Sequence, residues 1–257
     1  ILKLFNMLKI FIALSTFNRK NITKLCLENL KEIIHKDKHS KLAIYDDASH
    51  KYDIEFLKKY SSHVLRFRTT GGIERSRARS FRDFEYIFKN FDLLYITDND
   101  TIHDPDFLSV LREIYNLSAV NFEKKMPIGL FNSIFHSDPK NIIQNDNLLS
   151  IRKTCPGVSQ CYDRSMVTKI LDFLNKNPVY ETLYGFDYHW PASLGVPFIQ
   201  SNVSYVEHFA RDKDEKGIHS DFNEDDPIKD FERDRAQSPT SYLQKIRMKI
   251  IDKILSA

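Results

Sequence analysis

Two pairs of acidic residues follow short apolar segments in the first hundred residues of this 257-residue chain. Asp46 and Asp47 come directly after the apolar residues 42–45, and Asp98 and Asp100 come directly after a second segment of this kind. Two carboxylates that flank one residue can converge on a single hard divalent cation, directly or through water. Such a cation can bridge a diphosphate and neutralise the charge of a departing group. A polar turn that merely ends a strand is the alternative interpretation.

The sequence around these acids alternates between a strand pattern and a helical pattern. Short apolar runs predict strands at 10–14, 42–45, 64–67 and 93–96. Apolar spacing and capping residues predict helices at 22–33, 53–60, 73–89 and 104–115. This alternation predicts an α/β fold with a mostly parallel central sheet and helices on both faces. Ligands of such sheets bind beyond the carboxyl ends of the strands, where both acidic pairs lie.

The second half of the sequence is less regular. It predicts strands at 128–135 and 158–162, and helices at 164–175 and 185–195. Residues 211–238 are polar and charge-dense, which predicts a mobile loop. An amphipathic helix is expected from about Thr240, with Leu243 and Ile246 on its apolar side and lysines and arginines elsewhere.

Composition excludes several classes of protein. The 38 Lys and Arg residues against 35 Asp and Glu residues give a net charge of +3, too small to indicate nucleic acid as the main partner. No run of eighteen apolar residues is present, so we expect no membrane span. Three cysteines without a C-x-x-C motif predict neither a disulfide framework nor a four-thiolate zinc site. We expect Cys155 and Cys161 to be packing residues in a cytoplasmic protein.

Four segments occur in an order that is typical of one enzyme family. They are 12–19 (IALSTFNR), 44–49 (IYDDAS), 71–79 (GGIERSRAR) and 95–100 (YITDND). Together they resemble the GT-A glycosyltransferases, most closely the inverting family 2, across roughly residues 9–110. The resemblance implies a GT-A (Rossmann-like) fold and transfer from a nucleotide-sugar, with a UDP-sugar as the expected donor. It also implies a growing surface glycan, such as lipopolysaccharide or capsule, as the acceptor.

The resemblance implies a nucleotide-binding set at the strand ends. Its members are Ser15, Thr16, Asp47, Asp98 and either Arg77 or Arg79, between which the helical spacing does not choose. Asp47 would accept a hydrogen bond from an N–H of uracil, which suits an acceptor-only carboxylate. An arginine would donate two parallel hydrogen bonds to the base or the phosphates. A turn or capping role for Asp47 and a solvated helix face for the arginines are the alternatives.

The resemblance also implies a metal ion, Mn²⁺ or Mg²⁺, held by Asp98 and Asp100. Many GT-A enzymes complete the metal shell with a histidine from the second half of the chain. His208 ends an apolar segment and is the first candidate, and His219 is the second. A structural role for a single histidine is the alternative.

An inverting transferase needs a base that deprotonates the acceptor hydroxyl. The family supplies an Asp from a Glu-Asp pair at the start of a helix, and Asp187 is the nearest match. Phe186 stands where the Glu of that pair is expected, so Glu181 remains an alternative base. A first-turn acid that stabilises a helix would also explain Asp187. Trp190 is expected either to stack on an acceptor sugar or to pack in the core.

These expectations define a domain plan and a function. Residues 1–125 would form the nucleotide-sugar-binding half, 126–210 the acceptor-binding and catalytic half, 211–239 a mobile loop and 240–257 a terminal helix. Transfer of a single sugar is expected, since the Q-x-x-R-W motif of processive synthases is absent. The terminal helix would dock on the domain, on a second subunit of a homodimer, or on the inner face of the membrane. A sugar-nucleotide nucleotidyltransferase and a catalytically inactive nucleotide- or glycan-binding protein are the alternatives.

Overall fold

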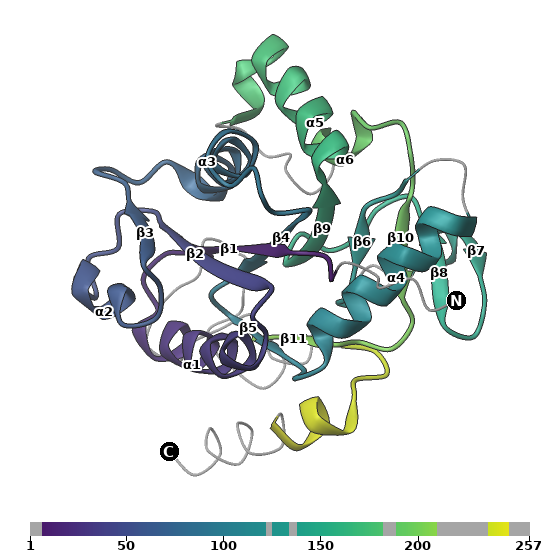
Figure 1. The fold of residues 1–257 in the computed structure, drawn as a ribbon, viewed down its shortest axis with the longest axis horizontal. Coiled ribbons are helices and arrows are strands. Elements are labelled where there is room, and N and C mark those ends of the chain that lie inside the picture. Colours follow the sequence, from purple (N-terminus) through teal and green to yellow (C-terminus); the bar gives the residue numbers. More distant parts are fainter. Residues whose placement is uncertain (1–6, 122–124, 134–137, 182–188, 210–235, 247–257) are drawn as a thin grey trace.

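A nine-stranded sheet runs through the molecule, with helices packed against both of its faces (Figure 1). The computed structural model describes residues 7–121, 125–133, 138–181, 189–209 and 236–246. The strand order is β3-β2-β1-β4-β9-β6-β10-β8-β7. This architecture confirms the predicted α/β fold with a central sheet between helices.

The first four strands of the sheet are parallel. They are β1 (Ile10–Thr16), β2 (Ser40–Asp46), β3 (His63–Arg66) and β4 (Leu93–Asp98). The register pairs Thr16 with Asp46 and Ser15 with Asp98, so the carboxyl ends of three strands meet at one edge. Both faces of β1 and β4 are covered, which explains their unbroken apolar sequences.

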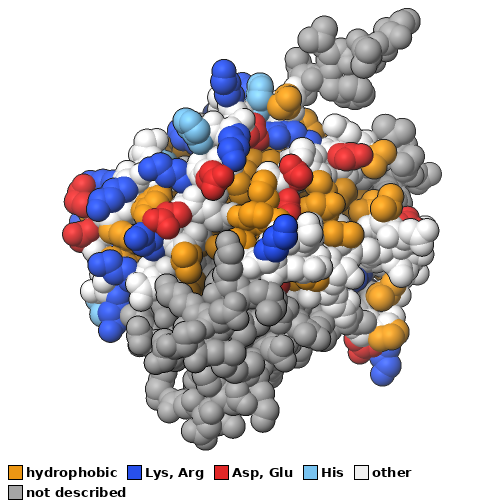
Figure 2. All heavy atoms as spheres, turned by 90° about the horizontal axis from the view of Figure 1, so that it is seen from below, with side chains coloured by type: hydrophobic (Ala, Val, Ile, Leu, Met, Phe, Trp, Pro, Cys, Tyr) orange, Lys and Arg blue, Asp and Glu red, His pale blue; other side chains and the backbone are white. Residues whose placement is uncertain are grey.

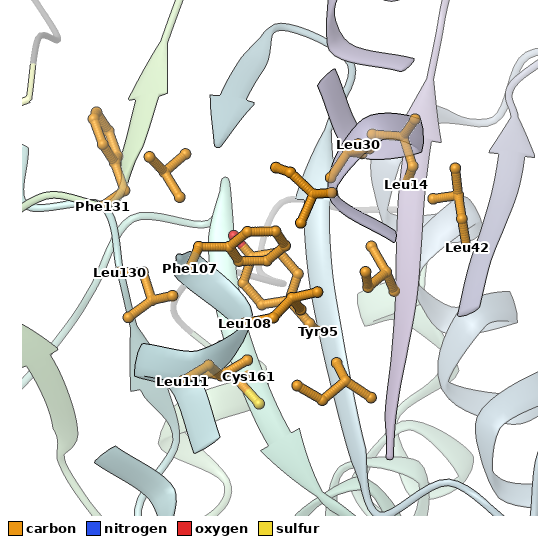
Figure 3. Packing of buried hydrophobic residues seen from close by; sticks show 14 of the residues in the cluster. Leu14, Leu30, Leu42, Tyr95, Phe107, Leu108, Leu111, Leu130, Phe131 and Cys161 are labelled. Atoms are coloured by element: carbon orange, nitrogen blue, oxygen red, sulfur yellow. The ribbon is translucent and has the colours of Figure 1, made fainter. Parts of the chain in front are cut away.

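Helices cover the two faces of this parallel part. The elements are α1 (Lys20–Lys36), α2 (Ile54–Lys58), α3 (Gly72–Tyr86), α4 (Phe107–Asn121), α5 (Arg164–Lys176) and α6 (His189–Ala192). In Figure 1, α1 and α4 lie below the sheet, whereas α3 and α5 lie above it. Figure 3 shows the lower core, in which Leu30 of α1 lies beside Leu14 of β1 and Leu111 of α4 lies beside Cys161 of β9.

The second half of the sheet mixes strand directions. Its strands are β6 (Ile128–Gly129), β7 (Ile142–Asn145), β8 (Leu149–Arg152), β9 (Ser159–Asp163) and β10 (Phe198–Ser201). β9 is antiparallel to both β4 and β6, whereas β10 is parallel to β6. Two short 3-10 helices, Pro139–Asn141 and Pro178–Glu181, join these elements.

The strand predicted at 128–135 is much shorter than expected. Only Ile128 and Gly129 pair in β6, after which the backbone bonds to segments outside the large sheet, as in the bond from the amide of Tyr205 to the carbonyl of Leu130 at 2.9 Å. The amide of Asn132 donates to the hydroxyl of Ser204 at 3.1 Å, and its side-chain amide donates to the carbonyl of Asn202 at 2.7 Å. The chain therefore leaves the sheet at its carboxyl edge. Residues 134–137 lie outside the described ranges.

A second, two-stranded sheet ties the two halves of the molecule together. It consists of β5 (Thr101–His103) and β11 (Val206–His208), in which His208 pairs with Thr101. The segment 236–246 packs beside it, since Leu243 is buried against Ile102 and Phe209. Residues 241–246 are helical, as predicted from about Thr240 onwards. The predicted loop at 211–238 lies largely outside the described residues.

The lower face of the molecule has a mixed surface. Figure 2 shows acidic and basic side chains interspersed among apolar ones on the coloured part of this face. None of the helices in the described ranges has the length and apolar character that crossing a bilayer requires.

Candidate functional site

Acidic side chains from the ends of two strands, β2 and β4, meet at the carboxyl edge of the parallel sheet. Asp46 ends β2, Asp47 follows it, and Asp98 ends β4. The amide of Asp47 donates to the carbonyl of Thr16 at 2.9 Å, which joins the end of β2 to the end of β1. The sequence prediction that these acids lie along one edge is therefore in agreement with the register of the strands.

Asp46 is the buried anchor of this edge. Its side chain is fully buried, and it accepts hydrogen bonds from Thr16 (2.8 Å), from Ser49 (2.5 Å) and from the Arg66 guanidinium (2.5 Å). The hydroxyl of Tyr52 lies 3.3 Å from the same carboxylate, and burial followed by the charge of Asp46 raises the pKa of Tyr52 to about 12. This network fixes the turn after β2. Sequence reasoning missed it, because nothing in the spacing distinguishes Asp46 from Asp47.

Asp47 holds the start of helix α3. One of its oxygens accepts from the amide of Gly72 at 2.9 Å, and the other accepts from the amide of Gly71 at 3.0 Å. Arg75 donates to the same carboxylate at 2.5 Å. Gly72 has a φ of +85°, a conformation that glycine adopts without strain. Asp47 therefore has the capping role that sequence analysis gave as the alternative, at the edge where the parallel strands end; its role toward a nucleotide stays a prediction.

The arginines of α3 diverge from one another. Arg77 is 1% exposed and donates to Asp98 at 2.6 Å, whereas Arg79 is 45% exposed at its side chain and donates to Asp83 at 2.7 Å. The structure thus places Arg77, and not Arg79, against the acids at the carboxyl edge of the sheet. We call this edge, with Asp47, Asp98 and Asp100, the rim. Arg75 is the arginine that sequence reasoning left out of the site. Its guanidinium lies 4.2 Å from the ring centre of Phe67, next to Asp47.

Asp100 is held by two cationic or ionisable side chains from distant parts of the chain. The Arg19 guanidinium lies 2.8 Å from its Oδ2, and the His208 imidazole lies 3.3 Å from the same oxygen. Arg19 begins α1, and His208 ends β11. Of the two histidine candidates, His208 lies beside Asp100, whereas His219 lies outside the described residues. The sequence gave no sign of Arg19.

Burial and ion pairing act differently on the two acids. Burial raises the pKa of Asp98, although the Arg77 guanidinium works against that effect. Burial also opposes ionisation of Asp100, but Arg19 and His208 outweigh it and hold the pKa of Asp100 well below its usual range. Asp100 is therefore an anion at neutral pH, with its charge balanced by protein groups.

The donor chemistry of these residues fits a hard divalent cation. Asp100 is 5% exposed, and its Oδ1 is buried with no hydrogen-bond partner among the residues that the structure describes. Asp98 uses Oδ1 for Arg77, and His208 adds a ring nitrogen close by. Within the described ranges, no three acidic, histidine or cysteine side chains already stand at metal-binding spacing. A cation at Asp100 would thus require local rearrangement of its present partners.

Two further residues of the first half lie at the same edge. Ser15 is buried and pairs in register with Asp98, on the strand that also carries Thr16. Cys26 of α1 lies beneath the turn, with its Sγ 3.6 Å from the carbonyl of Asp98. Burial raises the pKa of Cys26 to about 12, so it is a packing thiol. Cys155 and Cys161 are also buried, as expected.

The acceptor side is described in part. Asp187 and His219 lie outside the described residues. Glu181 forms a bidentate ion pair with Arg82 of α3, which engages both of its carboxylate oxygens. Trp190 is 1% exposed and donates its indole N–H to the carbonyl of Tyr180 at 3.1 Å. Trp190 is therefore a core residue, the second of its two expected roles.

Several solved structures have a fold similar to that of this chain. S. aureus TarS 1–349 with UDP-GlcNAc aligns with 77% of this chain at a TM-score of 0.56 and 14% identity, over 58% of that chain. The same fragment with UDP gives a TM-score of 0.53 at 14% identity, over 77% of this chain and 60% of that one. GalNAc-T7 with UDP, GalNAc and Mn²⁺ gives 0.56 at 9% identity, over 77% of this chain and 43% of that one.

These likenesses confirm the predicted GT-A fold. The chain spans less than two thirds of the length of these structures. No family model and no curated protein matches the sequence.

Proposed function

We propose that this protein is a metal-dependent inverting glycosyltransferase of family 2 type, which transfers a single sugar from a UDP-sugar to a glycan acceptor. One observation carries the proposal. Asp47, the Arg77–Asp98 pair and Asp100 with Arg19 and His208 come from separate elements and lie along one edge of a GT-A sheet. The ligands of the compared structures support it, since TarS binds UDP-GlcNAc and GalNAc-T7 binds UDP with Mn²⁺.

The donor would lie along this edge. Asp47 is fixed by the amides of Gly71 and Gly72 and is also bound by Arg75, so an N–H of uracil would take the place of the Arg75 contact on its carboxylate. Ser15 and Thr16 line the end of β1 beside it. The buried ion pair with Arg77 engages Oδ1 of Asp98 and fixes the orientation of this carboxylate, so that its Oδ2 would face the donor.

Asp98, Asp100 and His208 would hold a divalent ion, Mn²⁺ or Mg²⁺, at the diphosphate end of the donor. When bound, such an ion neutralises charge that develops on the departing diphosphate. Asp187 would deprotonate the acceptor hydroxyl as it attacks the anomeric carbon, with Glu181 as the alternative base. The ion pair with Arg82 occupies both carboxylate oxygens of Glu181, which a base needs. We therefore favour Asp187.

The remaining features define the biological setting of the proposal. Residues 1–125 would bind the donor and 126–210 the acceptor, since β9, β6 and β10 extend the same sheet beyond β4. The acceptor would be a growing cell-surface glycan at the inner face of the membrane. A nucleotidyltransferase is less well supported, because such enzymes use a glycine-rich loop after their first strand. Here β1 is followed by Phe17-Asn18-Arg19.

The first test measures ligand binding and its dependence on Asp100. Thermal unfolding is followed with UDP, GDP and other nucleotides, with and without Mn²⁺. A nucleotide at a hundred times its dissociation constant stabilises the folded state by about 2.7 kcal/mol. We expect such a shift for UDP with Mn²⁺, and we expect Asp100→Asn to abolish the contribution of Mn²⁺ to it. Asp106→Asn, at an exposed position six residues away, is the matched control.

The second arm measures turnover with a glycan acceptor. Release of a nucleoside diphosphate supports transfer, whereas release of pyrophosphate supports nucleotide activation. Asp187→Asn should abolish transfer and leave binding of UDP with Mn²⁺ intact. Binding without any turnover in the wild type would indicate an inactive binding protein. Absence of any nucleotide- or Mn²⁺-dependent stabilisation would rule out the proposed function.

A further inference from the structure

We infer that Arg19 is an exchangeable cation: it occupies Asp100 when no divalent ion is bound and moves to the diphosphate of the donor when the ion arrives. The inference rests on the proposed function and deepens it. It assigns Arg19 a donor-binding role, and it predicts that the divalent ion and the nucleotide bind cooperatively. The argument starts from the contacts of one carboxylate.

Asp100 carries its partners on one oxygen only. Arg19 at 2.8 Å and His208 at 3.3 Å both contact Oδ2, whereas Oδ1 is buried and has no hydrogen-bond partner within the described part of the chain. A buried carboxylate oxygen without a partner is costly, because it loses hydration and gains nothing in exchange. The geometry therefore points to a ligand on Oδ1. Arg19 stands beside that position, because it contacts the neighbouring oxygen of the same group.

The charges at the rim favour exchange. Arg77 balances Asp98 and Arg19 balances Asp100, so these four side chains sum to zero. A divalent ion added to this set would face the Arg19 guanidinium at short range, and two cations repel strongly in a largely buried setting. A diphosphate brings negative charge that can accept both the ion and the guanidinium. Arg is suited to this transfer, since its planar fork binds phosphate oxygens as well as carboxylates.

The backbone at Arg19 has an unusual left-handed conformation. Asn18 and Arg19 both have left-handed backbones, with φ of +50° and +49°. Non-glycine residues adopt this conformation at a cost in free energy that the surroundings must offset. Asn18 is held there by contacts with Ser49 and His50, which belong to the turn after β2. The strained loop thus places the Arg19 guanidinium, 16% exposed, between Asp100 and solvent at the start of α1.

Exchange of Arg19 has a thermodynamic signature. In the wild type, a divalent ion alone must displace the guanidinium and therefore binds weakly. In the presence of UDP, the displaced guanidinium gains phosphate contacts, so each ligand tightens the other by the same factor. Removal of the guanidinium should consequently strengthen binding of the ion alone and weaken binding of UDP to the ion-loaded protein. Changes of opposite sign are not expected from a residue that only supports the fold.

The experiment measures Mn²⁺ and UDP binding to the full chain. The electron paramagnetic resonance signal of unbound Mn²⁺ gives its affinity with and without UDP, and calorimetry gives the affinity for UDP at saturating Mn²⁺. For Arg19→Gln we expect Mn²⁺ alone to bind about tenfold tighter and the Mn²⁺–UDP coupling factor to fall by about tenfold, within the usual range of coupling between sites. Arg19→Lys, which keeps the charge without the fork, should lie between wild type and Arg19→Gln.

Lys20→Gln is the matched control, since it removes one positive charge at the adjacent, exposed position. It should change neither affinity appreciably. Weaker binding of Mn²⁺ alone to Arg19→Gln, or an unchanged coupling factor, would overturn the inference while leaving the proposed function in place. An equal effect of Lys20→Gln would also overturn it, since net charge would then be the cause. If wild type binds neither ligand, the proposed function fails together with the inference.

Discussion

The carboxylate of Asp47 links the end of β2 to the first residues of α3. It accepts hydrogen bonds from two backbone amides and from Arg75, and only 6% of the residue is exposed. Asp47→Asn keeps the size of the side chain but removes the charge and one acceptor oxygen. We expect it to lower the free energy of unfolding by about 1.5–3 kcal/mol, the usual range for hydrogen bonds to charged groups. Urea unfolding measures this change.

The control for Asp47→Asn is Asp53→Asn. Asp53 is exposed and caps α2 through the amide of Phe56 at 2.8 Å. Asn is about as good a helix cap as Asp, so this variant should change stability by less than about 0.5 kcal/mol. Equal effects of the two substitutions would show that Asp47 is an ordinary cap and not a buried anchor.

Sequence analysis was informative at the residue scale where chemistry follows the end of a strand. Asp47 and Asp98 were placed at one edge because parallel strands end together. Arg19 and the choice of Arg77 over Arg79 were not predictable, because they depend on a left-handed loop and on the rotation of α3 about its axis. Roles for Asp187 and His219 stay predictions.

At the scale of elements, α5 begins with a buried cap. Asp163 accepts from the amide of Met166 at 3.0 Å and from the hydroxyl of Ser165 at 2.7 Å, and Lys125 lies 3.0 Å away. We expect Asp163→Ala to destabilise the protein by about 2 kcal/mol at neutral pH, from loss of the cap and of charged hydrogen bonds. The measurement is the free energy of unfolding in urea.

The effect of Asp163→Ala should depend on pH. Burial opposes ionisation of Asp163, but its hydrogen bonds and Lys125 outweigh it and lower its pKa. An acid whose pKa is lowered by folding stabilises the protein above its unfolded pKa, and this contribution is lost as the pH falls through the folded pKa. The difference between wild type and Asp163→Ala should therefore narrow below about pH 4. Asp163→Asn, which keeps a neutral cap, should retain part of the lost stability at every pH; a pH-independent deficit in Asp163→Ala would contradict this account.

Elements with strong periodicity were predicted well. The four parallel strands and helices α1, α3 and α5 lie where the apolar spacing placed them, within a few residues. The hairpin of β7 and β8 and the three-residue β5 were missed. Their sequences are short and partly polar, and their pairing partners lie far away in the chain or on an exposed edge. β6 was predicted too long for the opposite reason, since an apolar sequence continues after the pairing ends.

At the scale of the whole molecule, His103 makes the fold sensitive to acid. It is fully buried, and burial lowers its pKa to about 3. The unfolded chain binds a proton here at about pH 6.5, whereas the folded protein does not. The contribution of His103 to the free energy of unfolding is therefore fully present above that pH. It is lost as the pH falls, by about 1.4 kcal/mol per pH unit between about pH 6 and pH 3.

The test of His103 compares slopes and not absolute stabilities. His103→Gln loses contacts with Thr97 and Tyr95, so it should be less stable than wild type at neutral pH. Its free energy of unfolding should nevertheless fall less steeply between about pH 6 and pH 4.5. The slope should correspond to the uptake of about one proton fewer on unfolding than in wild type. His35→Gln, on the exposed side of α1, should keep the wild-type slope. Identical slopes for all three proteins would contradict the prediction.

The overall architecture could be predicted for its parallel half and not for its mixed half. Alternation of strands and helices dictates parallel pairing of neighbours, as seen for β1, β2, β3 and β4. The antiparallel contact of β9 with β4 brings together residues that are more than sixty positions apart, and no local pattern encodes it. The resemblance to GT-A enzymes anticipated the fold as a whole, and the solved structures confirm it.

Phe209 and Ala236, which flank the segment 210–235, are both hydrogen-bonded to residues at or next to the rim. The amide of Phe209 donates to the carbonyl of Asp100 at 2.7 Å, and the amide of Ala236 donates to Glu207 at 3.0 Å. Doubling the length of a segment whose ends are already fixed together adds only about 0.6 kcal/mol of closure entropy. The intervening stretch can therefore diverge in length and composition from one homologue to another while β5 and β11 stay in register. Insertions in this stretch would therefore change the surface beside the carboxylates and leave the sheet intact.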